Sequence, residues 1–278
     1  MMIIWIASYP KSGNTWLKLF LSAYIGNHVD PKTFDINKMM IPFSLFPTNS
    51  LIKKFDIDCS NFNNLSKKWI SMQEYLNLMN KTIFLKTHNA MCTINGNSFT
   101  NSQQSLGGIY LVRDPRDIVV SYSDHLQKTY KDVTRTLAQS NTFEEGIIDD
   151  KKFNFTLLGS WSDHYNSWKN YRGVKILIIK YEDLVNNTFL TFEKIIKYLN
   201  SITQVSVNKD KIYECIQITK FENLKNLEIK DGFSEKGLGK YFFRAGKVGD
   251  WKGKLDEKLI KEIETKFNKE MTELGYLN

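Results

Sequence analysis

Short runs of apolar residues alternate along the chain with longer stretches in which apolar residues recur every three or four positions. The first run, 2–7, is continuously apolar, as expected of a strand that is buried on both faces. A polar turn over 8–13 follows, and residues 15–25 then have the spacing of an amphipathic helix. A buried strand, a tight polar turn and a helix are the opening of a mononucleotide-binding α/β fold.

The same alternation continues to the end of the chain. Apolar runs predict further strands over 82–86, 108–112 and 175–179. Helical spacing predicts helices over 65–79, 115–127, 161–171, 188–199, 210–224 and 257–274. Strands that alternate with helices indicate an α/β protein with a mostly parallel central sheet flanked by helices, similar to P-loop nucleotide-binding folds. No internal repeat and no Pro/Gly/Ser-rich linker interrupts the chain, so we expect a single domain over 1–278.

Two stretches fit this pattern poorly. Residues 30–62 contain three prolines, and residues 228–254 contain six glycines and many lysines. The second stretch is typical of a long functional loop. We expect 30–62, the residues after Asn89 and the polar stretch 128–154 to shape a pocket for a second ligand.

Composition and charge limit the classes of ligand and partner that we expect for this protein. Lysine and arginine outnumber aspartate and glutamate by 38 to 30, which gives a formal charge of +8 and favours an anionic ligand. The lysines are spread over many segments without an arginine-rich tract, so nucleic acid is disfavoured as a partner. The three cysteines lie far apart and predict no disulfide framework. The apolar run at the start lacks a basic flank and ends at Tyr9-Pro10, too early for a signal peptide or a membrane span. We therefore expect a cytoplasmic protein with no membrane partner.

The segment 9–16, Tyr-Pro-Lys-Ser-Gly-Asn-Thr-Trp, contains the first chemical signal. Backbone N–H groups at a helix N-terminus bind anions, and Gly13 allows a ligand to approach the backbone closely. Ser12 and Thr15 add hydroxyl donors, and Lys11 adds a full charge. The order differs from the GxxxxGK[ST] pattern of nucleotide hydrolases. An ordinary turn with a helix cap is the alternative, and the buried strand before the turn favours a ligand site.

A second candidate anion site follows the predicted strand 108–112. Arg113 lies at the strand end, and Ser121 lies eight residues later on the next helix. An arginine fork binds phosphate through two parallel hydrogen bonds. The alternative is that Arg113 pairs with Asp114 or Asp117 and that Ser121 is an ordinary helix residue.

A candidate base closes the strand 82–86. His88 follows at the carboxyl end of this strand, where parallel sheets bind their ligands. Histidine titrates near neutrality, so it can take a proton from a hydroxyl or an amine. Lys86 lies on the same side of the extended chain. The other three histidines, His28, His125 and His164, are expected to be surface or structural residues, and their spacing predicts no metal site.

Together these segments resemble, in order, the motifs of the cytosolic sulfotransferases that use 3′-phosphoadenosine 5′-phosphosulfate (PAPS). Residues 9–16 are similar to the family's Tyr-Pro-Lys-Ser-Gly-Thr-Thr-Trp loop, with Asn14 replacing a threonine. The resemblance implies that Lys11 contacts the bridging oxygen of the phosphosulfate and that Trp16 stacks on adenine, although Trp16 could also be helix core. The four residues that it implies around the 5′-phosphate are Ser12, Gly13, Asn14 and Thr15.

The same resemblance assigns the second anion site and the base. Arg113-Asp-Pro followed by Val-Ser121-Tyr is similar to the family's 3′-phosphate site, and ATP has no 3′-phosphate. Lys86-Thr-His88 is similar to the family's Lys-Thr/Ser-His motif. It implies that His88 is the general base and that Lys86, with Lys11, stabilises the transferring group. Asn89-Ala90 replaces the family's Leu-Pro, a departure that concerns the acceptor pocket.

The C-terminal half carries further similar motifs. Tyr181 follows a predicted strand and could either hydrogen-bond adenine or pack in the core. Thr219-Lys-Phe221 resembles a Thr-Ser-Phe motif near the adenine. Residues 243–251 resemble the family's Arg-Lys-Gly…Gly-Asp-Trp loop over the 3′-phosphate, which implies contacts from Arg244 and the backbone of Gly246. Ala245 replaces the usual lysine, so one charged contact is missing there. The dimer motif of many animal members is not evident after the loop, and the oligomeric state stays open.

The resemblance implies in-line transfer of a sulfuryl group from PAPS to a hydroxyl or amine of a small-molecule acceptor. Adenosine 3′,5′-bisphosphate (PAP) would be the second product, and the motifs require no metal. Two alternatives remain: an ATP-dependent P-loop kinase of a small molecule, and a non-catalytic nucleotide-binding module. The sequence does not identify the acceptor.

Overall fold

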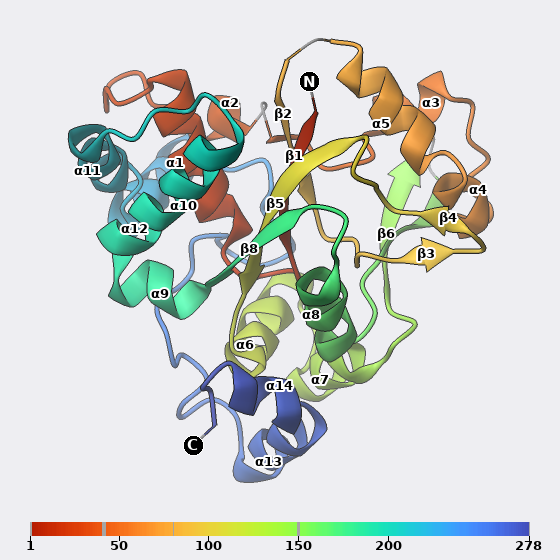
Figure 1. The fold of residues 1–278 in the computed structure, drawn as a ribbon. Coiled ribbons are helices and arrows are strands. Elements are labelled where there is room, and N and C mark those ends of the chain that lie inside the picture. The colour runs from red at the N-terminus through yellow and green to blue at the C-terminus, as the bar shows by residue number, and fades with distance from the viewer. Residues whose placement is uncertain (1, 41–42, 80, 149–150, 278) are drawn as a thin grey trace. The chain divides into compact units, whose positions relative to one another are not determined.

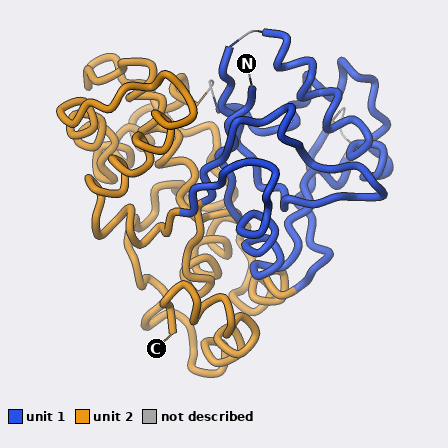
Figure 2. The backbone as a smooth tube through the Cα atoms, viewed as in Figure 1, with its two compact units in different colours: residues 1–9, 43–110, 139–178 blue, residues 10–42, 111–138, 179–278 orange. Residues whose placement is uncertain are grey.

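The computed structural model describes residues 2–40, 43–79, 81–148 and 151–277. The chain divides into two compact units, which Figure 2 distinguishes by colour. The first unit consists of residues 1–9, 43–110 and 139–178, and the second of 10–42, 111–138 and 179–278. Each unit is assembled from three separate segments, so no single position along the sequence divides them. The single domain over 1–278 therefore stays a prediction.

A mostly parallel four-stranded sheet has the strand order β2-β1-β5-β8. Its members are β1 (Ile3–Ser8), β2 (Ile83–Thr87), β5 (Ser105–Val112) and β8 (Lys175–Lys180). β1 and β2 pair in parallel, with Ile3 opposite Ile83 and Ala7 opposite Thr87. All six residues of β1 are buried, as its continuously apolar sequence requires. The four predicted strands are confirmed, and β5 begins three residues earlier than expected.

The other elements of the first unit are short (Figure 1). They are α3 (Asn49–Lys54), α4 (Phe62–Ser66), α5 (Trp69–Asn77), β3 (Thr93–Ile94), β4 (Asn97–Ser98), β6 (Phe143–Ile148), β7 (Lys151–Leu157) and α8 (Trp161–Asn170). Its core is aromatic: the ring of Phe99 lies 5.0 Å from Trp5, 5.3 Å from Trp69 and 6.4 Å from Trp168. The indole N–H of Trp5 donates to Ser105 Oγ at 2.8 Å, so this buried polar group is satisfied.

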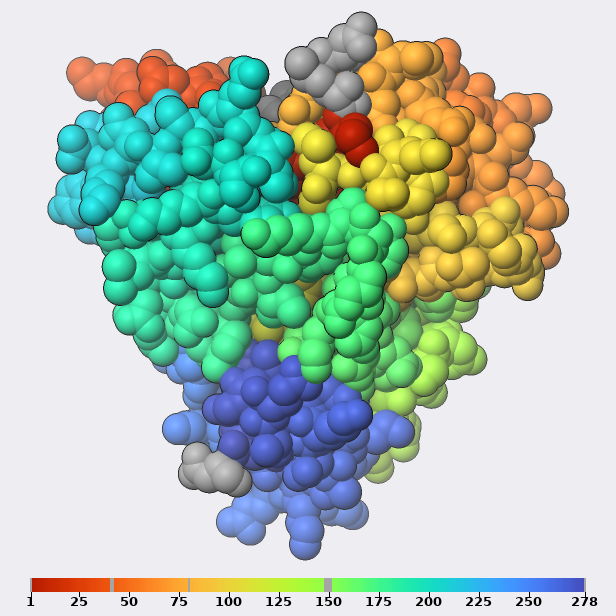
Figure 3. Space-filling model, viewed as in Figure 1, coloured from red at the N-terminus to blue at the C-terminus, as the bar shows by residue number. Residues whose placement is uncertain are grey.

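The second unit is mainly helical. Its helices are α1 (Asn14–Gly26), α2 (Ile36–Met40), α6 (Pro115–Leu126), α7 (Tyr130–Ala138), α9 (Tyr181–Asn186), α10 (Thr188–Ile202), α11 (Lys209–Ile218), α12 (Phe221–Asp231), α13 (Glu257–Lys266) and α14 (Asn268–Glu273). Phe20 of α1 stacks on Phe192 of α10 with 3.7 Å between ring centroids, and both side chains are fully buried. The C-terminal helices, drawn blue, lie at the surface in Figure 3.

A long segment from 232 to 254 contains no helix or strand. The sequence predicts this loop over 228–254, but the first four of these residues belong to the end of α12. Its path is held by Glu228 at the end of α12, because the two carboxylate oxygens accept hydrogen bonds from the N–H groups of Phe242 (2.6 Å) and Phe243 (2.9 Å). Charge-assisted hydrogen bonds of this kind are stronger than neutral ones. The segment is therefore an ordered loop, which we call the glycine loop.

Several predicted boundaries were wrong. The helix expected over 65–79 is two helices, α4 and α5, and those over 210–224 and 257–274 are likewise divided, at 219–220 and at Phe267. The polar stretch 128–154 contains helix α7 and an antiparallel hairpin, β6-β7, in which Phe143 lies opposite Leu157. Each of these elements buries only a few apolar residues, so the sequence pattern is weak there.

Among the described helices, none is long and apolar enough to cross a membrane. The three cysteines, Cys59, Cys92 and Cys215, are free thiols.

We expect Phe192→Ala to lower the free energy of unfolding by about 3–5 kcal/mol, because it opens a cavity beneath Phe20. Leu190→Ala on the same helix is the matched control. Leu190 is 65% exposed, so its truncation should change the free energy of unfolding by less than about 0.5 kcal/mol. Urea unfolding followed by circular dichroism measures both, and equal effects would contradict the packing described here.

Candidate active site

The turn between β1 and α1 reverses the chain through two residues with left-handed backbone conformations. These are Lys11, with φ of +66°, and Gly13, with φ of +98°. A left-handed lysine is uncommon and costs free energy, and such strain is concentrated at functional sites. Gly13 is the N-cap of α1, and no side chain caps this helix. No capping side chain therefore occupies the first N–H groups of α1, and N–H groups in this position can bind an anion. Anion binding at this turn stays a prediction.

Two hydroxyl groups of this turn differ in their surroundings. Ser12 is fully buried, and its Oγ has no hydrogen-bond partner among the described residues. Thr15 Oγ1 donates to one carboxylate oxygen of Glu235 at 3.0 Å, and the buried Lys18 donates to the other at 2.8 Å. A hydroxyl has one proton to donate. Thr15 must therefore exchange Glu235 for a phosphate oxygen if it is to bind one.

Tyr181 lies directly against the turn. A Cβ atom on Gly13 would lie 2.5 Å from Tyr181 Cδ2, so only glycine fits there. The guanidinium of Arg113 lies over the ring of Tyr181, 4.1 Å from the ring centroid. Burial raises the pKa of Tyr181, and the charge of Arg113 acts in the opposite direction. The close approach predicted at Gly13 is made by a protein ring here, which supports a packing role for Tyr181. Its contact with adenine remains a prediction.

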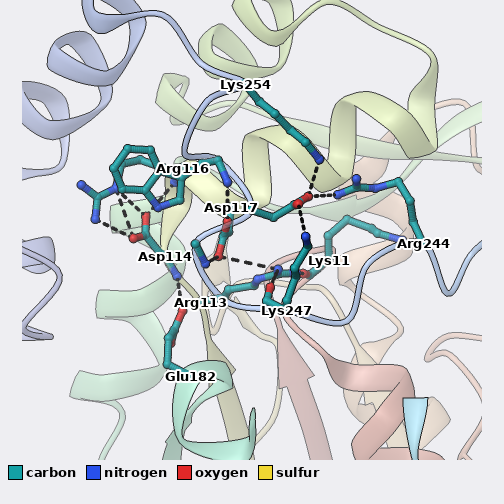
Figure 4. Close-up of polar contacts among 12 residues, drawn as sticks. Lys11, Arg113, Asp114, Arg116, Asp117, Glu182, Arg244, Lys247 and Lys254 are labelled. Carbon is teal, nitrogen blue, oxygen red and sulfur yellow. Dashed lines mark hydrogen bonds and ion pairs between the residues drawn. The ribbon is translucent and has the colours of Figure 1, made fainter. Parts of the chain in front are cut away.

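Arg113 joins three segments of the second unit (Figure 4). Its Nη1 donates to the Lys11 carbonyl oxygen at 3.0 Å, and its Nη2 donates to the Lys247 carbonyl oxygen at 3.2 Å. Nη2 also lies 3.8 Å from the carboxylate of Asp117. Asp114 instead pairs with Arg116 at 2.6 Å. Of the two acidic partners that the sequence left open, Asp117 is thus the one near Arg113.

The carboxylate of Asp117 fixes the far end of the glycine loop. It accepts hydrogen bonds from the N–H groups of Gly249 at 2.8 Å and Trp251 at 3.0 Å. Burial raises the pKa of Asp117, while the charge of Arg113 and the two N–H groups oppose that rise. Ser121, the predicted partner of Arg113 in anion binding, lies half-buried further along the same helix, α6. Helix α6 therefore carries both the anchor of the loop and a predicted phosphate contact.

Cationic side chains of the glycine loop lie around the carboxylate of Asp250. Arg244 and Lys254 both donate to its carboxylate, the latter at 2.7 Å, and Lys247 Nζ lies 3.9 Å away (Figure 4). Burial by itself would raise the pKa of Asp250, but the hydrogen bonds from Lys254 and Arg244 outweigh it and lower the pKa. Ala245 has a methyl group at the position where the family's Arg-Lys-Gly motif has a lysine. The cationic character of this loop comes instead from the residues that surround Asp250.

The remaining predicted donor contacts are distributed over the glycine loop and three helices. A Cβ atom on Gly246, whose φ is +62°, would lie 2.2 Å from the ring of Phe221. Thr219 is fully buried, and its hydroxyl donates to the Cys215 carbonyl oxygen at 2.6 Å, a structural role at the end of α11. Trp16 packs edge-on against Phe192 with 5.5 Å between ring centroids, which is the helix-core role that the sequence left open. All fourteen predicted donor contacts belong to the second unit: Lys11, Ser12, Gly13, Asn14, Thr15, Trp16, Arg113, Ser121, Tyr181, Thr219, Phe221, Arg244, Ala245 and Gly246.

The predicted base lies in the first unit. His88 is 9% exposed, and its Nδ1 lies 2.7 Å from the carbonyl oxygen of Ser8 at the end of β1. A carbonyl oxygen can only accept, so this contact requires the proton on Nδ1 and leaves the lone pair on Nε2. That tautomer is the one that can take a proton at Nε2. Lys86 is half-buried in β2, and its backbone N–H donates to Ser44 at 3.0 Å.

His164 was expected to be a surface or structural residue, and it is structural. Its side chain is fully buried, between the hydroxyl of Tyr110 (2.8 Å from Nδ1) and the carbonyl oxygen of His88 (2.9 Å from Nε2). Burial lowers the pKa of His164 to about 4, against a weaker opposing effect of the His88 hydrogen bond. The sequence held one signal of this burial, since His164 shares a predicted helix face with Trp161 and Trp168.

Asp250 and Glu235 are functional candidates that sequence reasoning missed. Asp250 lies within a recognised motif, but nothing in the sequence shows that Arg244 would bond to it. Glu235 lies in a loop without periodicity, and no spacing relates it to Thr15. The described part of the chain contains no group of three or more His, Cys, Asp or Glu side chains that could hold a metal ion.

A buried strand, a left-handed turn and the start of a helix are together typical of mononucleotide-binding α/β folds. The family model for the sulfotransferase domain matches residues 3–275, and the chain belongs to this family. The predicted enzyme class, a sulfotransferase, is thereby confirmed.

Relatives and solved structures agree with this membership. The chain is 29% identical over 257 residues to cytosolic sulfotransferase 1 of Danio rerio, covering 90% of this chain and 76% of the relative. It is 23% identical over 285 residues to flavonol 4′-sulfotransferase of Flaveria chlorifolia, covering 98% and 80%. A mouse sulfotransferase complexed with PAP has a TM-score of 0.63 at 22% identity, covering 98% of this chain and 85% of that one. The last similarity confirms the predicted fold class, a mostly parallel sheet flanked by helices.

The buried His164 predicts a specific dependence of stability on pH. The folded state keeps this imidazole neutral down to about pH 4, whereas the unfolded chain protonates it below its ordinary pKa of 6.5. The unfolded state therefore binds more protons, and stability falls as the pH drops from 6.5 towards 4. The loss should reach about 3 kcal/mol by pH 4.

Urea unfolding of the wild type and His164→Gln between pH 7.5 and 4 measures this, because the variant lacks the titrating group. The stability difference between the two proteins should shrink steadily below pH 6.5. Parallel pH profiles would contradict the assignment.

Proposed function

We propose that this protein transfers a sulfuryl group from PAPS to a hydroxyl or amine of a small-molecule acceptor in one in-line step, with His88 as the general base. The contact between His88 Nδ1 and the Ser8 carbonyl oxygen is the observation that carries the proposal, because it sets the tautomer that a base requires. PAPS supplies an activated sulfuryl group whose leaving group is the phosphate of PAP.

Features of the second unit support PAPS as the donor. The buried Ser12 hydroxyl and the Nε of Arg113 both lack partners among the described residues, so each is available to an anionic ligand. The left-handed turn and the start of α1 suit the 5′-phosphate. Arg113 and the cations around Asp250 suit the additional 3′-phosphate. These groups fit a doubly phosphorylated nucleotide.

The chemistry we assign to the residues is simple. His88 Nε2 takes the proton of the acceptor while the acceptor oxygen or nitrogen bonds to sulfur and the bond from sulfur to the bridging oxygen breaks. Lys11 and Lys86 offset negative charge on the departing phosphate and on the sulfuryl oxygens. Catalysis of this kind depends on positioning and on electrostatic stabilisation.

Similar proteins support the acceptor class and the location that we propose. Two of the solved structures are retinol dehydratase with androsterone or with retinol, each with PAP. They have the same fold and bind small apolar alcohols, so a small molecule is the acceptor class we propose. Relatives named cytosolic sulfotransferases support a cytoplasmic location.

We expect His88→Ala to lower turnover by about 10²–10⁴-fold, because a fixed general base contributes this much. The affinity for PAP should be nearly unchanged, since the variant leaves the second unit intact. Radiolabelled PAPS with a panel of alcohols, phenols and amines measures turnover, and calorimetry measures PAP binding. His28→Ala, at an exposed histidine, is the matched control and should be as active as the wild type. Near-normal turnover of His88→Ala would overturn the assignment of the base.

The donor is tested by competition. PAP should bind more tightly than ADP by about 10–100-fold, because hydrogen bonds to a charged 3′-phosphate contribute about 1.5–3 kcal/mol. Calorimetric titration of each nucleotide into the protein gives this ratio. Equal binding would contradict PAPS as the donor and favour an ATP-dependent kinase.

A further inference from the structure

One face of helix α8 holds the backbone of the segment that contains the proposed base. His164, Ser167 and Trp168 are spaced three and four residues apart, so they lie on the same face of the helix. His164 Nε2 lies 2.9 Å from the His88 carbonyl oxygen, and Trp168 Nε1 donates to the Asn89 carbonyl oxygen at 3.0 Å. Ser167 Oγ accepts from the N–H of Met91 at 3.0 Å. Three neighbouring peptide groups are thus held by one helix.

The contact to His88 has a defined proton arrangement. The His88 carbonyl oxygen can only accept, so His164 Nε2 carries a proton and donates it. His164 Nδ1 must then accept, and the Tyr110 hydroxyl donates to it at 2.8 Å. Tyr110 and His164 are both fully buried, and the ring of Tyr9 packs edge-on against His164 at 5.4 Å. A buried, fully satisfied chain of this kind holds its members in one arrangement.

The orientation of the His88 ring depends indirectly on the hydrogen bonds that connect Tyr110, His164 and the His88 carbonyl oxygen. The ring is fixed at Nδ1 by Ser8, and its backbone is fixed at the carbonyl oxygen by His164. A shift of the His88 backbone would carry Cβ and the ring with it, which would lengthen the contact with Ser8 and change the direction of the Nε2 lone pair. Misplacement of a catalytic group by about 1 Å can cost about 10²-fold in rate.

We propose that His164 is a positioning residue for sulfuryl transfer. Through its hydrogen bond to the His88 carbonyl oxygen, it holds the general base in the orientation in which Nε2 takes the acceptor proton. This inference rests on the proposed role of His88. The competing explanation is that His164 stabilises the core and has no specific link to catalysis.

The variants separate these two explanations. His164→Phe fills the space without a donor, whereas His164→Gln retains an N–H near the position of Nε2. Tyr110→Phe keeps His164 but removes the hydroxyl that holds its tautomer. Trp161→Phe is the matched control, because Trp161 is equally buried at the start of the same helix. Each variant is made in the wild type and in His88→Ala, and urea unfolding measures the stability of all of them.

We expect His164→Phe to lower kcat by about 10²-fold with the best acceptor of the panel, with the KM for PAPS and the affinity for PAP little changed. His164→Gln should recover most of this loss, and Trp161→Phe should keep the wild-type kcat. In His88→Ala, neither His164→Phe nor Tyr110→Phe should lower kcat further, because residues that act through one group are not additive.

Independent losses in the His88→Ala background, or a wild-type kcat for folded His164→Phe, would overturn the inference. If His164→Phe does not fold, the same two results with Tyr110→Phe decide it. A fully active His88→Ala would instead refute the proposed base, and no turnover with any acceptor would refute the proposed function. Failure of the inference about His164, failure of the proposed base and failure of the proposed function would therefore each give a different result.

Discussion

The guanidinium of Arg113 makes the interaction that holds the turn after β1 and the glycine loop of the second unit together. It bonds to the backbone of the turn at Lys11 and to the backbone of the glycine loop at Lys247, and its charge lies beside Asp117. Two segments that are more than 230 residues apart in the sequence are joined by one side chain. Because a guanidinium is always charged and presents its donors in a rigid fork, one arginine can hold both segments and still favour an anion. A lysine would offer the charge without the two directed bonds.

In the first unit, the contacts of interest are those that orient the side chain of His88. His88 follows a strand whose partner, β1, supplies the carbonyl oxygen that sets its tautomer. Parallel pairing of β1 and β2 brings the carboxyl ends of both strands to the same edge, so the sheet itself determines this contact. The ring of Tyr110 stacks on Trp168, and its hydroxyl bonds to His164, so buried contacts adjoin that edge. Burial favours these hydrogen bonds, because leaving a buried polar group unpaired costs free energy.

Strain and electrostatics are concentrated in the turn and the glycine loop. Lys11 adopts a left-handed conformation that a lysine rarely accepts, and Glu235 bonds to the hydroxyl of Thr15 and the ammonium of Lys18. Asp250 likewise holds Arg244 and Lys254. In both places a carboxylate of the protein bonds to groups that suit an anionic ligand. A phosphate that bound at either place would have to compete with these internal ion pairs.

The sequence by itself determined the four strands of the sheet, the turn after β1 and the order of the motifs, because buried strands and glycine turns leave local patterns. It also predicted chemistry at His88, at Arg113 and in the region of the glycine loop. Only the tertiary structure decided that Asp117 rather than Asp114 lies beside Arg113, that Tyr181 occupies the space next to Gly13, and that His164 holds the backbone of His88. These contacts join residues that are distant in sequence, and no local periodicity records which side chain will face which backbone group. Local patterns specify elements, whereas packing specifies partners.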